Sequence, residues 1–173
     1  MKTKMSQLFT FGVLALSAVI ALADQSAVKD DESRKDVVKV AVGSPDHKTL
    51  VDLVLHVHYN DVLANPGPFT VFAPTDAAFA ALPKGTIESL KKKGSEATLQ
   101  DILEYHVFVG VLKEGLQLVD GATFNQANLK DIKITGKGKK LQVNGANILG
   151  SVKASNGIVY VIDKVLLPPA DKK

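Results

Sequence analysis

His106 is the side chain in this sequence whose chemical type and position most invite a catalytic interpretation. It follows Glu104-Tyr105 where a helical pattern gives way to a strand pattern, and an imidazole there can act as a general base. A base needs a nucleophile to activate, but the chain contains no cysteine and no legible Ser-His-Asp arrangement. We therefore interpret His106 as a buried, hydrogen-bonded structural histidine and predict that the protein is not an enzyme.

Two further histidines, His56 and His58, raise the possibility of a metal site. On a helix, residues two apart point roughly 200° away from each other, so these two side chains cannot bind one ion together. Asp52 and His56 do share a helix face, but two weak ligands do not make a site. We interpret them as a local pair on an exposed polar face, and we predict no metal and no other cofactor.

Lysine clusters at 91–93 and at Lys137 with Lys139-Lys140 are candidates for binding an anionic polysaccharide or a membrane surface. The alternative, which we favour, is a solvated helix end and a charged hairpin tip that discourages strand pairing at an edge. The glycines at 136 and 138 lack the spacing of a phosphate-binding loop. The acidic residues show no pairing suited to glycoside hydrolysis; those considered are Asp36, Asp61, Asp101 and Asp163.

The stretch from Phe69 to Phe79 is predicted to be a buried strand that turns into a helix. Apolar and polar positions alternate from Phe69 to Ala73, which is the period of a strand, and Pro74 ends it because proline has no amide hydrogen for a sheet ladder. Thr75 is a good N-cap, and Asp76 stands in the first helical turn where the helix dipole favours a negative charge.

The rest of the chain predicts an α+β fold with a helix-rich first half and a strand-rich second half. Helical patterns cover 36–42, the segment from 44 through Val57, 86–93 and 98–106, whereas Asn60 and the following prolines and glycine break the chain. Strand patterns cover 107–112, 131–135, 140–143, 146–152 and 158–167, with turn signals at Gly136, Asn144-Gly145 and Asn156-Gly157.

The first 23 residues have the pattern of a secretory signal peptide. Lys2 and Lys4 precede an apolar run over 8–20, and Ala21-Leu-Ala23 has the small residues of a cleavage site. We expect a flexible polar tether at 24–35, one folded domain at 36–169 and a tail at 170–173. No other apolar run is long enough to span a membrane, so we expect no stable span after cleavage.

Charge and cysteine content restrict the function further. The 173-residue chain has a formal net charge of +3, and loss of Lys2 and Lys4 with the signal peptide leaves a nearly neutral protein. A nucleic-acid partner is therefore not expected. The absence of cysteine predicts a domain without disulfides that relies on its core. Together with the absence of Asn-x-Ser/Thr acceptors, this fits a secreted bacterial protein of the periplasm or the extracellular space.

Two segments resemble the signatures of fasciclin (FAS1) domains. Thr70-Val-Phe-Ala-Pro-Thr-Asp-Ala-Ala-Phe79 is similar to the first signature, and Asn156-Gly-Ile-Val-Tyr-Val-Ile-Asp-Lys-Val-Leu-Leu-Pro168 is similar to the second. Between them, Tyr105-His106 resembles the central Tyr-His motif of the family. One departure is Tyr160, where family members often carry histidine.

The resemblance implies a compact wedge of two antiparallel sheets packed with several helices. It implies structural roles for residues of the motifs, and the pairing of those motifs leads us to expect Asp76 or the Thr75 hydroxyl beside His106. We expect Phe72 and Phe79 to lie in the core. The structural motif residues are Thr75, Asp76, Phe79, His106, Asn156, Gly157 and Asp163.

The resemblance also implies extracellular adhesion or binding without catalysis. Tyr105-His106 matches a pair associated with integrin binding in some animal members, and Asp131-Ile132 is a looser match to a second such pair. We take these four residues as a candidate binding surface for an extracellular or envelope protein or a polysaccharide. The alternative function is a carrier of an apolar small molecule such as a carotenoid or a lipid, since some family members resemble carotenoid-binding proteins.

Overall fold

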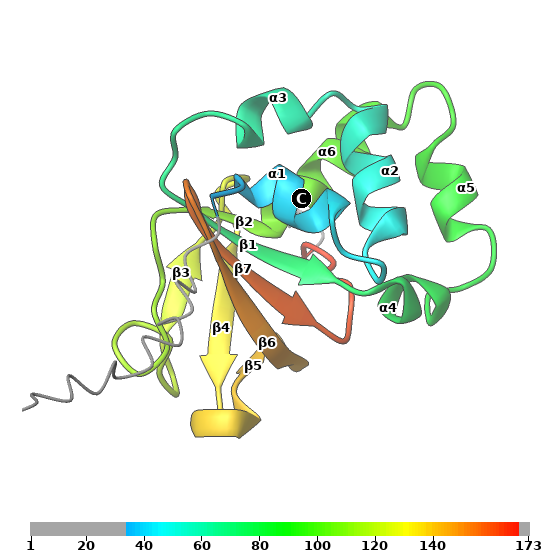
Figure 1. The fold of residues 1–173 in the computed structure, drawn as a ribbon. Coiled ribbons are helices and arrows are strands. Elements are labelled where there is room, and N and C mark those ends of the chain that lie inside the picture. Colours follow the sequence, from blue (N-terminus) through cyan, green and yellow to red (C-terminus); the bar gives the residue numbers. More distant parts are fainter. Residues whose placement is uncertain (1–33, 170–173) are drawn as a thin grey trace, which may run out of the picture.

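The computed structural model describes residues 34–169 (Figure 1). The predicted signal peptide at 1–23, most of the predicted tether and the predicted tail at 170–173 lie outside the described residues. Within them, helices precede most of the strands along the chain, and the predicted α+β class is confirmed.

The described residues form six α-helices, of which the first and the fourth have an N-cap side chain that accepts a hydrogen bond from the first turn. Asp36 caps the first helix by accepting a hydrogen bond from the Lys39 amide at 2.8 Å. The second buries the predicted face of Leu50, Leu53 and Val54. A short helix beginning at Asn60 was not predicted, because asparagine there indicated a chain break. The helices are α1 Val37–Val42, α2 Lys48–His56, α3 Asn60–Leu63, α4 Asp76–Ala80, α5 Thr86–Leu90 and α6 Glu96–Tyr105.

Within residues 34–169, seven strands form a single mixed sheet in the order β2-β1-β7-β6-β5-β4-β3. The expectation of two antiparallel sheets is corrected here, because β1 runs parallel to β7 and joins the two halves into one sheet. Alternation within a strand does not reveal which strand it pairs with, and β1 and β7 are far apart in the sequence. The strands are β1 Phe69–Pro74, β2 Val107–Val109, β3 Thr123–Asn125, β4 Asp131–Thr135, β5 Gln142–Val143, β6 Ala146–Ala154 and β7 Gly157–Ile162, and a 3-10 turn spans Gly138–Lys140.

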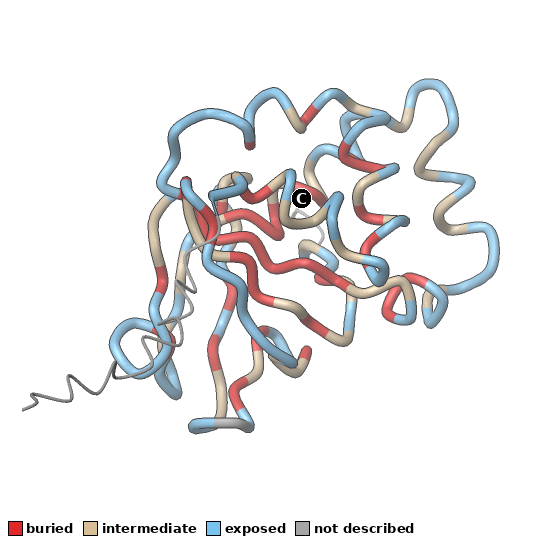
Figure 2. The backbone as a smooth tube through the Cα atoms, viewed as in Figure 1, coloured by how far each residue is buried: buried red, intermediate tan, exposed pale blue. Residues whose placement is uncertain are grey.

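The sheet separates two apolar cores. In Figure 1 the helices gather mainly on one side of the sheet, and β1 and β7 run through the middle of the molecule. All six residues of β1 are buried, as the red tube in Figure 2 shows. Its alternation sends Phe69, Val71 and Ala73 into the core under the helices and Phe72 into the core of the opposite face. There Phe72 stacks on Tyr160 of β7, with ring centroids 5.8 Å apart.

The turn from β1 into α4 follows the prediction. The Thr75 side chain accepts a hydrogen bond from the Ala78 amide, and Asp76 is the first residue of the helix. Phe79 is 6 % exposed and joins the core beneath the helices. The burial predicted for Phe72 and Phe79 is therefore confirmed.

Replacing Phe79 by alanine should remove about 3–5 kcal/mol from the free energy of unfolding, because the buried ring leaves a cavity that the core cannot close. Urea unfolding followed by circular dichroism measures the change. Leu116→Ala is the control, since that side chain is 71 % exposed and its loss should change stability by at most about 0.5 kcal/mol. Equal stability of Phe79→Ala and the parent would contradict the assignment.

Candidate functional site

His106 forms the C-cap of α6 and uses both of its ring nitrogens inside the protein. Nδ1 lies 2.7 Å from the Ile102 carbonyl oxygen, and Nε2 accepts a hydrogen bond from the Leu166 amide at 2.9 Å. A carbonyl oxygen only accepts and an amide N–H only donates, so the ring must be neutral with its proton on Nδ1. Burial lowers the pKa of His106 to about 4, which keeps it neutral at physiological pH.

The expectation that Asp76 or Thr75 pairs with His106 is wrong. The Asp76 carboxylate instead accepts hydrogen bonds from the amides of Thr49 at 2.8 Å and Lys48 at 3.3 Å. These amides open α2, whose own N-cap residue, His47, provides no side-chain cap. Asp76 thus caps a helix other than its own, and the hydrogen bond from Thr49 holds the pKa of its carboxyl below the usual value.

Asn156 joins three separate segments through one buried side chain. Its Nδ2 donates to the carbonyl oxygens of Leu63 at 2.8 Å and Asn65 at 2.7 Å, while Oδ1 accepts from the Val37 amide at 2.9 Å. Its backbone carbonyl accepts from the Phe69 amide at 2.9 Å. The first turn of α1, the end of α3 and the start of β1 therefore all depend on this residue.

Gly157 follows at the closest approach between β1 and β7. A Cβ atom at this position would overlap the Phe69 carbonyl, so any larger side chain would push the central strands apart. Its φ angle is ordinary, and the requirement for glycine here is one of space.

Asp163 ties the end of β7 to the start of β6. Its carboxylate accepts from the Asn147 backbone amide at 2.7 Å and from the Asn147 side-chain amide at 2.5 Å. The pairing register of β6 and β7 shifts between Ile148 and Gly150. The Asp163 carboxylate thus holds the two strands together next to a β-bulge.

Of the four candidate binding residues, three are buried. Tyr105, His106 and Ile132 are 2 %, 3 % and 0 % exposed, whereas Asp131 is exposed. The structure does bring Tyr105 to Asp131, since the tyrosine hydroxyl donates to the Asp131 carbonyl oxygen at 2.7 Å. The hydroxyl also accepts a hydrogen bond from the Asn144 side chain. The four residues therefore do not form one exposed surface as expected. Of the four, only Asp131 is exposed to a partner.

A turn beside Asp131, over residues 126–130, is not predicted by the sequence pattern. Leu129 within it has φ 64° and is 80 % exposed, which is a strained conformation for a bulky residue. Asn128 anchors the turn by donating to the carbonyl and carboxylate oxygens of Asp101 at 3.1 and 3.0 Å. The Leu129 carbonyl oxygen accepts from the Asn125 side chain at 2.8 Å. No sequence signal marks leucine for a left-handed conformation, so only the structure reveals this exposed side chain on a hydrogen-bonded turn.

His47, at the start of α2, contacts Ser44. The Ser44 hydroxyl lies 2.7 Å from His47 Nδ1, three residues along the chain. The other ring nitrogen of His47 is buried and has no hydrogen-bond partner in the described part of the chain. A catalytic triad needs an acid that orients the imidazole from that side. The pair is therefore a local contact at the entry to α2 and not a nucleophilic site.

Asp52 does not pair with His56 but forms an ion pair with Lys91, the first residue of the 91–93 cluster. This contact links α2 to the end of α5. Within residues 34–169, no group of three or more His, Cys, Asp or Glu side chains is arranged to hold a metal ion.

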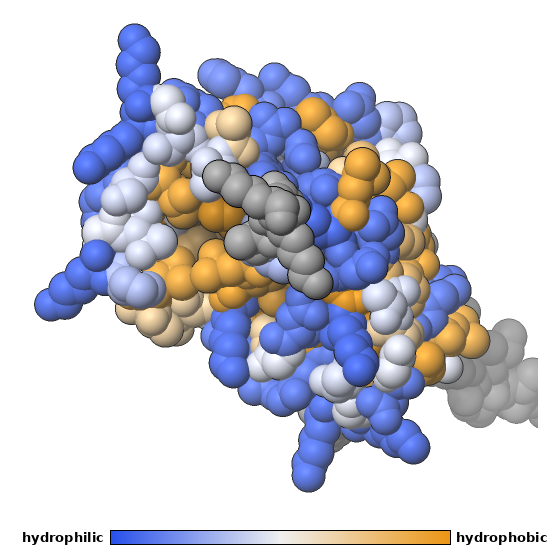
Figure 3. All heavy atoms as spheres, turned by 180° about the vertical axis from the view of Figure 1, so that it is seen from behind, coloured by the Kyte–Doolittle hydropathy of each residue, from blue (hydrophilic) through white to orange (hydrophobic). Residues whose placement is uncertain are grey.

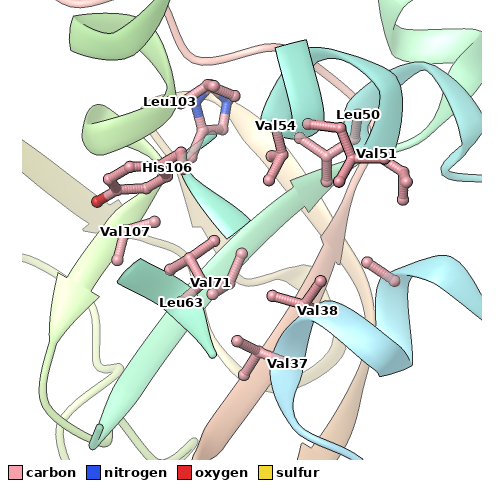
Figure 4. Close-up of a pocket in the computed structure, with 13 residues that line it drawn as sticks. Val37, Val38, Leu50, Val51, Val54, Leu63, Val71, Leu103, His106 and Val107 are labelled. Carbon is pink, nitrogen blue, oxygen red and sulfur yellow. The ribbon is translucent and has the colours of Figure 1, made fainter. Parts of the chain in front are cut away.

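The helices enclose a small apolar cavity of about 40 Å³ against β1. Figure 4 shows side chains of α1 and α2, such as Val37 and Val54, directed toward a common space with Val71 of β1. His106 also lines this cavity, but both of its ring nitrogens are engaged elsewhere. The space suits one or two very small molecules, because one water needs roughly 10–15 Å³ by this measure.

A sequence model of the fasciclin domain family matches residues 45–168. The chain therefore belongs to the fasciclin domain family. It resembles Protein sll1483 of Synechocystis sp., with 41 % identity over 86 % of this chain and 81 % of that protein. It also resembles the immunogenic protein MPB70 of Mycobacterium bovis, with 38 % identity over 80 % of this chain and 72 % of that protein.

The fold also has a solved counterpart. The FAS1 domain pair of the insect cell adhesion molecule Fasciclin I matches with a TM-score of 0.68 and 22 % identity, over 78 % of this chain. This chain spans about half of that one, 51 % of its length. The match supports the fold assignment.

Gly157→Ala should lower the free energy of unfolding by about 1–3 kcal/mol, because the added methyl group overlaps backbone atoms of Phe69. Gly150→Ala is the matched control: it lies on the neighbouring strand, and its Cβ would meet open space. Thermal melts at low protein concentration compare the two. Equal effects of both substitutions would show that the approach of β1 to β7 does not require glycine.

The stability of the protein should fall by about 3 kcal/mol as the pH drops from 6.5 to about 4, because of His106. The unfolded chain takes up a proton at this residue near pH 6.5, whereas the folded protein does so only near pH 4. The contribution is thus complete above pH 6.5 and lost as the pH falls through this window.

His106→Gln should be less stable at pH 7 and should show a correspondingly smaller loss between pH 6.5 and 4. Urea unfolding at a series of pH values measures both quantities. Protonation of the Asp36 and Asp76 carboxyls lowers the stability only below this window, because their pKa values in the folded protein lie below 3.8. An unchanged pH dependence in His106→Gln would contradict the neutral, buried assignment.

Proposed function

We propose that this protein is an exported, non-catalytic fasciclin domain that binds a protein partner in the extracellular or envelope space. Support comes from the names of similar proteins: MPB83 of Mycobacterium bovis, 42 % identical over 61 % of this chain and 46 % of that protein, is a cell surface glycolipoprotein. Fasciclin I is a cell adhesion molecule. Export rests on the predicted signal peptide. No helix among the described residues is long and apolar enough to cross a membrane.

The proposal that the protein is not catalytic rests on one observation: the polar residues of the motifs form hydrogen bonds inside the protein. His106 binds the backbone through both nitrogens, Asp76 caps α2, and Asp163 holds Asn147. A general base needs a ring nitrogen or carboxylate that can reach a substrate. These groups instead stabilise the fold, which favours binding over catalysis.

The surface that best fits a partner is the turn at 126–130 together with Asp131. Leu129 projects from it, and its backbone carbonyl oxygen accepts a hydrogen bond from Asn125, while Asn128 anchors the turn to α6. A turn whose backbone is already ordered loses less conformational entropy on binding than a flexible loop does. Figure 3 shows that apolar side chains also reach the surface on the side hidden in Figure 1. Leu129 is the most exposed of the large apolar residues described. An apolar projection beside a carboxylate favours a protein partner over a polysaccharide.

The alternative function, transport of a carotenoid or lipid, has less support. Pockets for drug-sized ligands usually measure several hundred Å³. The enclosed apolar cavity measures about 40 Å³, far too little for a carotenoid without movement of the helices. Solvent extraction of protein purified from its native source would reveal a bound pigment or lipid.

Leu129→Gly should weaken partner binding at least about tenfold, because it removes an exposed anchor of the proposed surface. The same change should stabilise the protein by about 1 kcal/mol, since glycine adopts the left-handed conformation without strain. Immobilised variants incubated with solubilised envelope proteins of the source cells, followed by quantitative mass spectrometry, measure retention of the proteins that the parent captures.

Leu116→Ala serves as the matched control, since it also truncates an exposed leucine, 71 % exposed, outside the turn. Asp131→Lys tests the neighbouring carboxylate. Retention of the same partners by Leu129→Gly and Asp131→Lys would place the binding surface elsewhere. Failure of the parent to capture any envelope protein would contradict the proposed function itself.

A further inference from the structure

Most of strand β6 has an open edge. It pairs with β7 from Ile148 to Ala154, but with β5 only at Ala146 and Asn147. Among residues 34–169, no other strand pairs with the outer edge of β6 from 149 to 153. All five residues of this stretch are exposed, and Figure 2 shows a long pale-blue segment beside buried strands. We call this stretch the β6 edge.

The backbone of the β6 edge offers hydrogen-bonding groups to a further strand. Ala154 and Gly157 are paired across a two-residue turn, so their backbone groups face each other. In an antiparallel ladder the direction of the backbone N–H and C=O groups alternates from residue to residue. The backbone groups of Val152 and Gly150 therefore also point toward β7. Ser151 and Lys153 direct their N–H and C=O groups outward. Such groups are a template for pairing with another chain.

Hollows with exposed apolar side chains flank the β6 edge on both faces of the sheet. An open hollow of about 510 Å³ lies beside Leu149 and Gly150 and is also lined by Leu141 and Glu114. A second hollow of about 260 Å³ lies beside Val152, under α1. Leu149 and Val152 are 60 % and 42 % exposed. An added strand could therefore bury side chains on both faces.

Two of the charged residues beside the β6 edge, Lys153 and Glu114, have opposite signs. Lys153 and Glu114 are both exposed, and neither forms a salt bridge within the described residues. Lys153 is paired with Ile158, whose side chain packs on the core that contains Leu141. Leu141 also lines the hollow that holds Glu114, so the lysine and the glutamate lie on the same face of the sheet. They stand toward opposite ends of the β6 edge.

We propose that the β6 edge pairs antiparallel with the β6 edge of a second copy of this chain. The twofold axis passes beside Ser151, which then pairs with itself. In this register Lys153 lies opposite Leu149 of the other copy, next to the hollow that contains the other copy's Glu114. The ion pair between Lys153 of one copy and Glu114 of the other therefore forms twice, once on each side of the axis, as an isologous interface requires. Val152 lies opposite Gly150, which leaves it room.

A second copy fits better than an arbitrary strand. An exposed lysine and a β-bulge are both features that discourage indiscriminate pairing at a sheet edge. The symmetric register supplies a carboxylate for that lysine, whereas an unrelated apolar strand would not. The interface goes beyond the proposed partner binding and uses different residues from the turn at 126–130.

Sedimentation velocity over a range of protein concentrations should show a monomer–dimer equilibrium for the full exported chain. Ser151→Pro should weaken dimerisation at least tenfold, because proline removes the central outward N–H without disturbing the ladder to β7. Ser151→Thr is the control and should dimerise like the parent. Circular dichroism melts establish that the proline variant is folded.

Charge reversal provides a test that does not depend on proline. Lys153→Glu and Glu114→Lys should each weaken the dimer, and the double variant should restore it because the attraction is rebuilt with opposite signs. A parent that stays monomeric at all concentrations would overturn the proposal, including the case in which residues 24–33 of the same chain cover the edge. A dimer unaffected by Ser151→Pro, or a double variant no better than the single ones, would overturn it as well.

Discussion

The parallel pairing of β1 with β7 is the constraint on which the rest of the structure depends. It joins the first signature of the chain to the second and makes one sheet from two sets of strands. Gly157 allows the approach, since any Cβ there would overlap the backbone of Phe69. Asn156 then attaches the start of α1 and the end of α3 to the same point. Both faces of β1 are buried as a result, and each face has its own core.

Polar residues of the motifs stabilise this arrangement from inside. His106 connects α6 to the segment after β7 through two backbone hydrogen bonds, and its neutrality follows from burial. Tyr160 donates a hydrogen bond to the Leu112 carbonyl oxygen at 2.8 Å, so its hydroxyl also has a buried partner. The polar side chains of His106 and Tyr160 are thus engaged in hydrogen bonds inside the protein. The two contact regions that we propose, Leu129 and the β6 edge, consist instead of exposed residues.

Much of the local structure could be predicted from the sequence. The strand from Phe69, the cap at Thr75 and the pairing of β4 with β5 depend on alternation, capping and turn residues, which are properties of neighbouring positions. The candidate site was predicted less well. Tyr105 ends helix α6 and Asp131 begins strand β4, but whether each side chain faces the core or solvent depends on elements from other parts of the chain.

The sequence by itself determined the α+β class, the membership in the fasciclin family and the burial of Phe72 and Phe79, because periodicity and long signatures record these directly. Only the tertiary structure decided that Asp76 caps α2 instead of meeting His106, and that β1 runs parallel to β7. It also decided the left-handed conformation of Leu129. Each of these features depends on how segments distant in the sequence are placed relative to one another. A hydrogen bond between such segments, or a strained turn, forms only when the folded chain brings its partners together.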